Sequence, residues 1–99
     1  MNVRFKHWDC VGLWHRYSNG RFALQLVDAD TGEPIATATV NIPPEPLEDG
    51  EIIIKSYSEN EGMVDALVKA GVIEKPHRAI KTGWVQADVA MLKMRPDKA

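Results

Sequence analysis

The residues best suited to chemistry lie near the N-terminus, in the segment FKHWDCVGLWHRY. It contains two imidazoles, a carboxylate and the single thiol of the chain: His7, Asp9, Cys10 and His15. On a regular strand His7, Asp9 and His15 share one parity, and His77 could join them around a metal ion. Cys10 and His15 could instead act as nucleophile and base. These residues define one hypothesis, a small metal- or thiol-dependent enzyme.

The spacing of these residues gives that hypothesis little support. It matches no H-x-x-x-H or C-x-x-C ligand pattern, and the chain has no G-x-S-x-G elbow or glycine-rich phosphate loop. A lone cysteine is more commonly a small buried apolar residue. We therefore expect no catalytic residue, no metal and no cofactor, and we keep the enzyme as the alternative function.

Two tryptophans fit a different function, the recognition of another protein. Trp8 and Trp14 share a parity opposite to that of the other large apolar residues in the segment. If a helix covers the apolar face, these indoles lie on the outer face of the sheet. Exposed aromatic side chains are enriched in protein interfaces. The alternative is that a bulge near residues 9–12 turns the indoles into the core.

An acidic loop and one glycine complete the candidate binding residues. The segment PPEPLEDG at 43–50 contains three prolines, which exclude regular structure, and it is either an acidic recognition loop or a solvated connection. Gly62 lies in the first turn of a predicted helix, where it costs ~1 kcal/mol relative to alanine and permits a close backbone approach. The candidate protein-binding residues are Trp8, Trp14, Glu45, Glu48, Asp49 and Gly62.

Composition and charge restrict the class of protein. Ninety-nine residues, 44% of them hydrophobic, suffice for a single domain spanning 1–99 with one core. The formal net charge of −2 and the scattered basic residues argue against nucleic-acid binding. There is no run of ~18 apolar residues and no apolar N-terminal segment, so we expect neither a membrane span nor a signal peptide. The single cysteine indicates a reducing, cytoplasmic location.

Turn and strand signals predict a mostly antiparallel sheet that positions these residues. Segment 3–17 favours one strand with a bulge, and Asn19-Gly20 is typical of a type I′ hairpin turn. Strands at 21–28 and 35–42 follow, so that the N-terminal half forms a three-stranded meander. Further strands are expected at 51–57, briefly around 78–81, and at 84–92, where Trp84 opens the last strand.

One helix is predicted at about 59–70, within YSENEGMVDALVKAG. Ser58 as N-cap and Glu61 three residues later form a capping box, and Ser56 with Glu59 offers an alternative start. Gly71 and Val72 fit the αL residue and the hydrophobic residue of a Schellman C-cap. The predicted fold is therefore α+β: a mostly antiparallel sheet of about five strands, covered on one face by a single helix, with a polar tail at 94–99 that frays.

The order of these features resembles an uncharacterised family of small accessory proteins carried by bacterial plasmids, prophages and phages. The matching segments are FKHWDC, YSNGRFALQLVDADTGEPIATATVN, YSENEGMVDALVKAGVI and TGWVQADVAML. The resemblance covers nearly the whole chain and carries no catalytic residue over. It implies an accessory protein of a mobile element. The charge, the lack of a catalytic constellation and the aromatic and acidic candidates add the expectation that it binds a host protein, and anti-CRISPR inhibitors of host defence are an analogy among small acidic phage proteins.

Self-association is the last expectation. The predicted strand IATATVNI at 35–42 has no charge and no internal proline, so it is poorly defended if it lies at a sheet edge. We therefore expect a homodimer formed through the sheet, which Thr39→Lys would dissociate.

Overall fold

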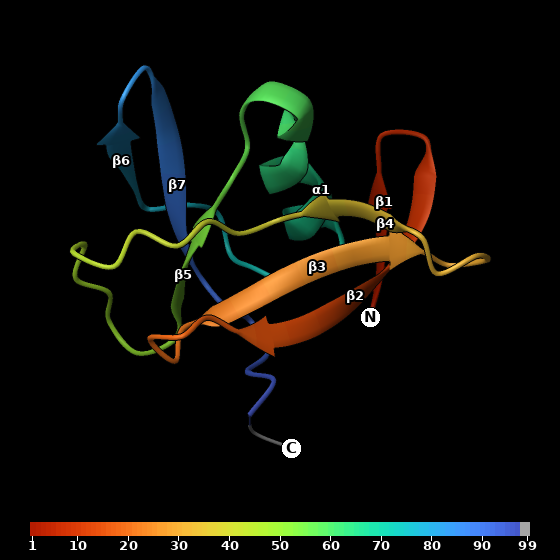
Figure 1. The fold of residues 1–99 in the computed structure, drawn as a ribbon, viewed down its shortest axis with the longest axis horizontal. Helices are drawn as coiled ribbons and strands as arrows, with labels where there is room; N and C mark the ends of the chain where they lie inside the picture. The colour runs from red at the N-terminus through yellow and green to blue at the C-terminus, as the bar shows by residue number, and fades with distance from the viewer. Residues whose placement is uncertain (98–99) are drawn as a thin grey trace.

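The computed structural model describes residues 1–97 and shows an α+β fold, as the sequence predicts (Figure 1). All paired strands are antiparallel, and α1 lies between the β1–β2 hairpin and the β6–β7 hairpin. No helix in the described part is long and apolar enough to cross a membrane. The elements are β1 (Asn2–Phe5), β2 (Trp8–Arg16), β3 (Phe22–Asp28), β4 (Pro34–Thr37), β5 (Glu51–Ile54), a 3₁₀ turn (Ser58–Asn60), α1 (Met63–Lys69), β6 (Arg78–Thr82) and β7 (Val85–Met91).

The strands form two sheets, so the expectation of about five strands was too low. One sheet has the order β1-β2-β3-β4 and the other has the order β5-β7-β6. The residues after β4 join them: Thr39 bridges Ile54, and the Val40 amide donates to the Ile53 carbonyl at 3.1 Å. The predicted strand 35–42 is therefore divided between the two sheets, and only its first residues remain at an edge.

Segment 3–17 is a hairpin and not one bulged strand. Lys6 and His7 form a two-residue turn, with Lys6 at a φ of 54°, and Phe5 pairs directly with Trp8. Paired residues across an antiparallel ladder share a face, so the two-residue turn explains the change of apolar parity that suggested a bulge. The ladder between β2 and β3 is regular, and the register shift lies instead between Leu26 and Val27 on β3.

The next turn also differs from the predicted type I′ geometry. Gly20 has a φ of 84°, whereas Asn19 is not in the positive-φ region. The Gly20 amide donates to the Tyr17 carbonyl at 2.9 Å, and the Tyr17 amide donates to the Arg21 carbonyl at 2.8 Å. This is a three-residue loop in which a type I turn precedes a glycine in αL.

The predicted capping box is absent, and the helix is shorter than expected. Ser58 begins a 3₁₀ turn at a φ of 54°, and α1 starts only after Gly62, whose φ is 93°. The buried Asn60 side chain explains the difference, because its amide donates to the carbonyls of Thr37 (2.6 Å) and Lys55 (3.1 Å). Those bonds anchor SENEG to the sheet connection and hold it out of the helix.

The C-terminal end of α1 matches the prediction. Gly71 has a φ of 76°, its amide donates to the Val68 carbonyl, and the Val72 amide donates to the Leu67 carbonyl. This pair of bonds is the Schellman motif, and Val72 is buried as its hydrophobic residue.

Two hydrophobic clusters hold the elements together. The main core gathers side chains from both sheets and the inner face of α1, including Phe5, Leu24, Ile54, Met63 and Leu67. A smaller second core lies between β5, β6 and β7 and the loop that follows β4. Its buried members are Ile53, Ile80, Ala87 and Val89, and Val40, Ile42, Leu47 and Tyr57 pack against them.

Gly62→Ala is expected to lower the free energy of unfolding by ~1 kcal/mol. The cost comes from the positive φ, because a methyl group at this position would meet no neighbouring atom. Urea denaturation measures it, and Glu61→Ala at the exposed preceding position is the control, expected within ~0.5 kcal/mol of wild type. Equal stability of Gly62→Ala and wild type would contradict this assignment.

Candidate protein-binding surface

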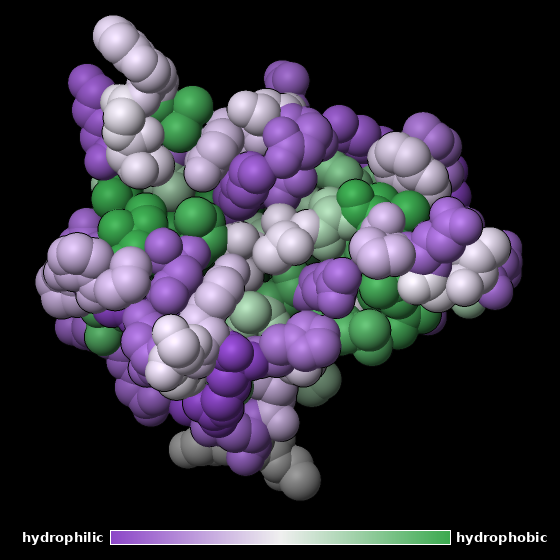
Figure 2. Space-filling model, in the orientation of Figure 1, coloured by the Kyte–Doolittle hydropathy of each residue, from purple (hydrophilic) through white to green (hydrophobic). Residues whose placement is uncertain are grey.

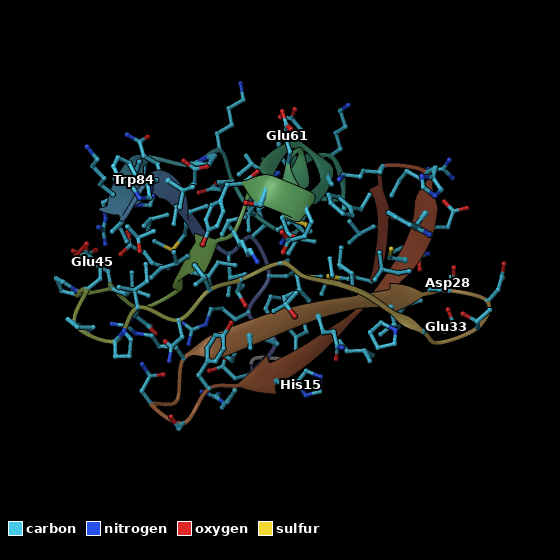
Figure 3. The ribbon with its side chains drawn as sticks, turned by 45° about the horizontal axis from the view of Figure 1, so that its top comes forward. His15, Asp28, Glu33, Glu45, Glu61 and Trp84 are labelled. Atoms are coloured by element: carbon cyan, nitrogen blue, oxygen red, sulfur yellow. The ribbon has the colours of Figure 1, made fainter. Side chains whose placement is uncertain are left out.

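The histidines of the N-terminal segment do not form a site. His7 lies in the β1–β2 turn with its ring stacked on Trp8 at 4.0 Å, and Asp9 forms an ion pair with Arg4 at 2.8 Å. His15 extends from β2 on the side away from α1 (Figure 3). Among residues 1–97, no group of three His, Cys, Asp or Glu side chains is arranged to hold a metal ion.

Cys10 is a core residue in this structure. Its side chain is buried, and its Sγ lies 3.9 Å from the Trp8 carbonyl. Burial raises the pKa of the Cys10 thiol, and Asp28 and Asp9 add to that increase. Cys10 pairs with Asp28 across the ladder, whereas His15 pairs with Ala23, so the proposed nucleophile and base lie at different places on β2. The geometry does not favour thiol chemistry.

Trp8 and Trp14 are half-buried and pack against the main core. The rings of Trp14 and Phe22 form a T-shaped pair, with ring centroids 6.0 Å apart. The Phe22 ring in turn lies under the guanidinium of Arg16 at 4.4 Å and near that of Arg95 at 5.7 Å. Both tryptophans therefore contribute to packing while remaining partly exposed. They lie neither fully on the outer face of the sheet nor fully in the core, which were the two alternatives.

The acidic loop at 43–50 is tied to the body of the protein by arginines. Glu45 lies 3.9 Å from Arg78, and Asp49 forms an ion pair with Arg95 at 2.8 Å. Arg21 donates hydrogen bonds to the carbonyls of Ile42 and Glu45. Glu48 is exposed beside them. These contacts hold the loop against the rest of the protein. Arg95 belongs to the predicted frayed tail, of which 98 and 99 lie outside the described residues.

Glu51 links this loop to β6. Its carboxylate is only 5% exposed and accepts hydrogen bonds from His77, from Arg78 at 3.3 Å and from the Glu48 amide at 2.8 Å. Burial opposes the charged form, but these three donors outweigh it, so the pKa of Glu51 lies below its ordinary value. An open pocket of about 460 Å³ borders the pair His77 and Glu51.

Glu51→Gln is expected to cost ~2 kcal/mol of stability at pH 7, because charged hydrogen bonds are lost. The folded-state pKa of Glu51 is lowered, so its contribution is complete above the ordinary pKa of 4.5 and is lost as the pH falls through the folded pKa. The difference between Glu51→Gln and wild type should therefore shrink below pH 4.5 in urea denaturation. Glu48→Gln is the control. A difference that does not change with pH would contradict this.

Gly62 borders a groove of about 690 Å³ between the β1–β2 hairpin and α1. Its lining combines buried Val3, Cys10 and Ala66 with charged side chains from both elements. One of these, Lys6, already donates to the Glu59 carbonyl at 2.8 Å. The positive φ of Gly62 explains why a glycine occupies this position. A methyl group there would meet no neighbouring atom, so no close backbone approach in the groove requires the glycine.

Trp84 is the residue that the sequence interpretation missed. Gly83 and Trp84 form the two-residue turn between β6 and β7, which Thr82 and Val85 close. Trp84 has a relative exposure of 103%, far above that of Leu13 at 41%. Figure 3 shows its side chain at the end of the hairpin, and Figure 2 shows the hairpin end projecting from the body at the upper left. The indole makes no contribution to the core.

The residues near Trp84 form one projecting surface, which we call the hairpin tip: Ala79, Lys81, Trp84 and Gln86. All four are exposed, and β6 is the last strand of its sheet order. The signal was present in the sequence, because KTGWVQ has glycine at the first position of a two-residue hairpin loop, between two strand-like runs. Because Trp84 was expected to open the last strand, the two-residue turn was not predicted.

Comparisons of the chain with protein-family models, with curated proteins and with solved structures found no match. The resemblance to accessory proteins of mobile elements therefore stays a prediction.

Proposed function

We propose that the chain is a protein-binding module that acts without catalysis, and that the hairpin tip is its binding surface. The observation that carries this proposal is the complete exposure of Trp84 on a two-residue turn. Tryptophan is among the residues most enriched at the energetic centres of protein interfaces. It combines a large apolar surface with few rotatable bonds, so it loses little entropy when a partner covers it.

The free energy available from covering one tryptophan side chain supports a role for Trp84 in binding. A tryptophan side chain buries roughly 150–250 Å² when covered, which corresponds to roughly 4–6 kcal/mol at about 25 cal/mol/Å² before the costs of association. The short β6–β7 ladder and the second core hold the turn, because Ile80, Ala87 and Val89 are buried beneath it. The indole is thus presented by a defined scaffold, which reduces the cost of ordering it on binding.

The partner in this proposal is a protein of a bacterial host. The resemblance to accessory proteins of mobile elements motivates this choice, together with a cytoplasmic location. Inhibition of a host defence system, as by anti-CRISPR proteins, is the activity proposed by analogy with small acidic phage proteins of similar size. The net charge of −2 supports a protein partner over nucleic acid.

Photo-crosslinking in cells of the host bacterium tests the proposal. The chain would be produced with benzoylphenylalanine in place of Trp84, and in a matched control in place of Leu13, the exposed apolar residue on β2. We expect a discrete covalent adduct with one host protein from position 84 and none from position 13. No adduct above background, or the same adducts from both positions, would overturn the proposal.

A further inference from the structure

The outer edge of β6 is available to a further strand. The order β5-β7-β6 leaves β6 without a neighbour on one side in the described part of the chain. The other edges are less open: residues 38–40 lie along β5, α1 packs beside β1, and Asn60 donates to the last carbonyl of β4. The free edge of β6 runs directly to Trp84.

The hairpin register determines which backbone groups face that edge. Thr82 and Val85 close the two-residue turn, and such a closing pair exchanges hydrogen bonds within the ladder. Hydrogen-bonded and non-hydrogen-bonded pairs alternate from there, so the amides and carbonyls of Ala79 and Lys81 point away from β7. Ala79 is small and exposed, which leaves room for a strand to approach.

The charge along the outer edge of β6 indicates which kind of strand would bind there. Lys81 is exposed on β6, and no ion pair involving it occurs among residues 1–97. Within the β6–β7 ladder, the acidic residue on the same face as Lys81 is Asp88, which pairs with Ala79. A second copy of this chain paired along this edge would place two Lys81 side chains on one face of the same ladder, which like charge disfavours. An acidic side chain on the added strand pairs favourably with Lys81.

We propose that the outer edge of β6 binds an extended segment of the partner by strand addition, with an acidic residue of that segment facing Lys81. The inference rests on the proposed function and names the kind of segment recognised. Backbone hydrogen bonds to Ala79 and Lys81 align the segment, and Trp84 covers its end nearest the turn.

Selection from a phage-displayed library of random ten-residue peptides tests this inference. We expect selected peptides in which β-branched residues alternate with acidic ones. Selection against Lys81→Glu should enrich basic residues instead, whereas Lys69→Glu, the same charge change on α1, should leave the acidic preference intact. Affinity for a selected peptide should fall by about tenfold or more in Ala79→Pro, which removes an outward-facing amide.

N-methylation of alternate amides in the peptide provides a second measurement on the wild-type protein, in case Ala79→Pro does not fold. It should weaken binding by a similar factor. A selection without binders, peptides insensitive to N-methylation, or unchanged enrichment with Lys81→Glu would each overturn the inference. If those results occurred while position 84 still crosslinked to one host protein, strand addition would be excluded and the protein-binding function would stand.

Discussion

Trp84→Ala is expected to weaken binding of the crosslinked host protein by about 30-fold or more, which is about 2 kcal/mol. The free energy of unfolding should stay within ~0.5 kcal/mol of wild type, because Trp84 is fully exposed and belongs to neither core. Titration calorimetry with the purified host protein measures the first effect, and urea denaturation measures the second. A large loss of affinity without a loss of stability is the pattern of a binding anchor.

Two variants make this prediction specific. Leu13→Ala removes the exposed apolar side chain on β2 and should leave the affinity unchanged. Trp84→Phe keeps an aromatic ring of smaller area and should retain part of the affinity. If Leu13→Ala weakened binding as much as Trp84→Ala does, the contact surface would extend over β2 and the hairpin tip would lose its special role.

Thr39→Lys is expected to unfold the protein, at a cost of about 4 kcal/mol or more. Thr39 is 3% exposed, its hydroxyl bonds the Tyr17 hydroxyl at 2.8 Å, and it accepts the Leu24 amide at 3.2 Å. A lysine there would bury an ammonium group without a counter-charge and leave these partners unsatisfied. Far-ultraviolet circular dichroism and urea denaturation measure the loss.

Thr37→Lys is the matched control. Thr37 is the exposed last residue of β4, two positions earlier, and lysine should change stability there by less than about 1 kcal/mol. Comparing the stability of Thr39→Lys with that of Thr37→Lys shows whether segment 35–42 is buried at residue 39 or lies at an open sheet edge there. Light scattering that found a folded Thr39→Lys monomer beside a wild-type dimer would restore the predicted edge and contradict the buried position of Thr39.

Local signals predicted those elements whose geometry depends on nearby residues. Gly71 and Val72 set the end of the helix through bonds within one turn, and the sequence located that end correctly. The start of the helix could not be located in this way. It depends on Asn60, which bonds the carbonyl of Thr37, 23 positions away, and no capping pattern contains that partner.

The candidate site was harder to predict because exposure is a property of the folded chain. The parity of Trp8 and Trp14 left their burial open, and packing against the main core with Phe22 and Arg16 determines it. Trp84 looked like the first residue of a strand. Its exposure follows from the Gly83-Trp84 turn and from the second core, which holds the hairpin so that its end projects.

Hydrogen exchange of the protein, free and bound to the crosslinked host protein, is the measurement that tests the hairpin tip most directly. We predict that binding slows exchange in residues 78–86 and leaves the acidic loop at 43–50 unchanged. The groove residues at 3–10 and 62–70 should also be unchanged. Slower exchange confined to the loop or to the groove, with residues 78–86 unaffected, would contradict the assignment of the binding surface to Trp84 and β6.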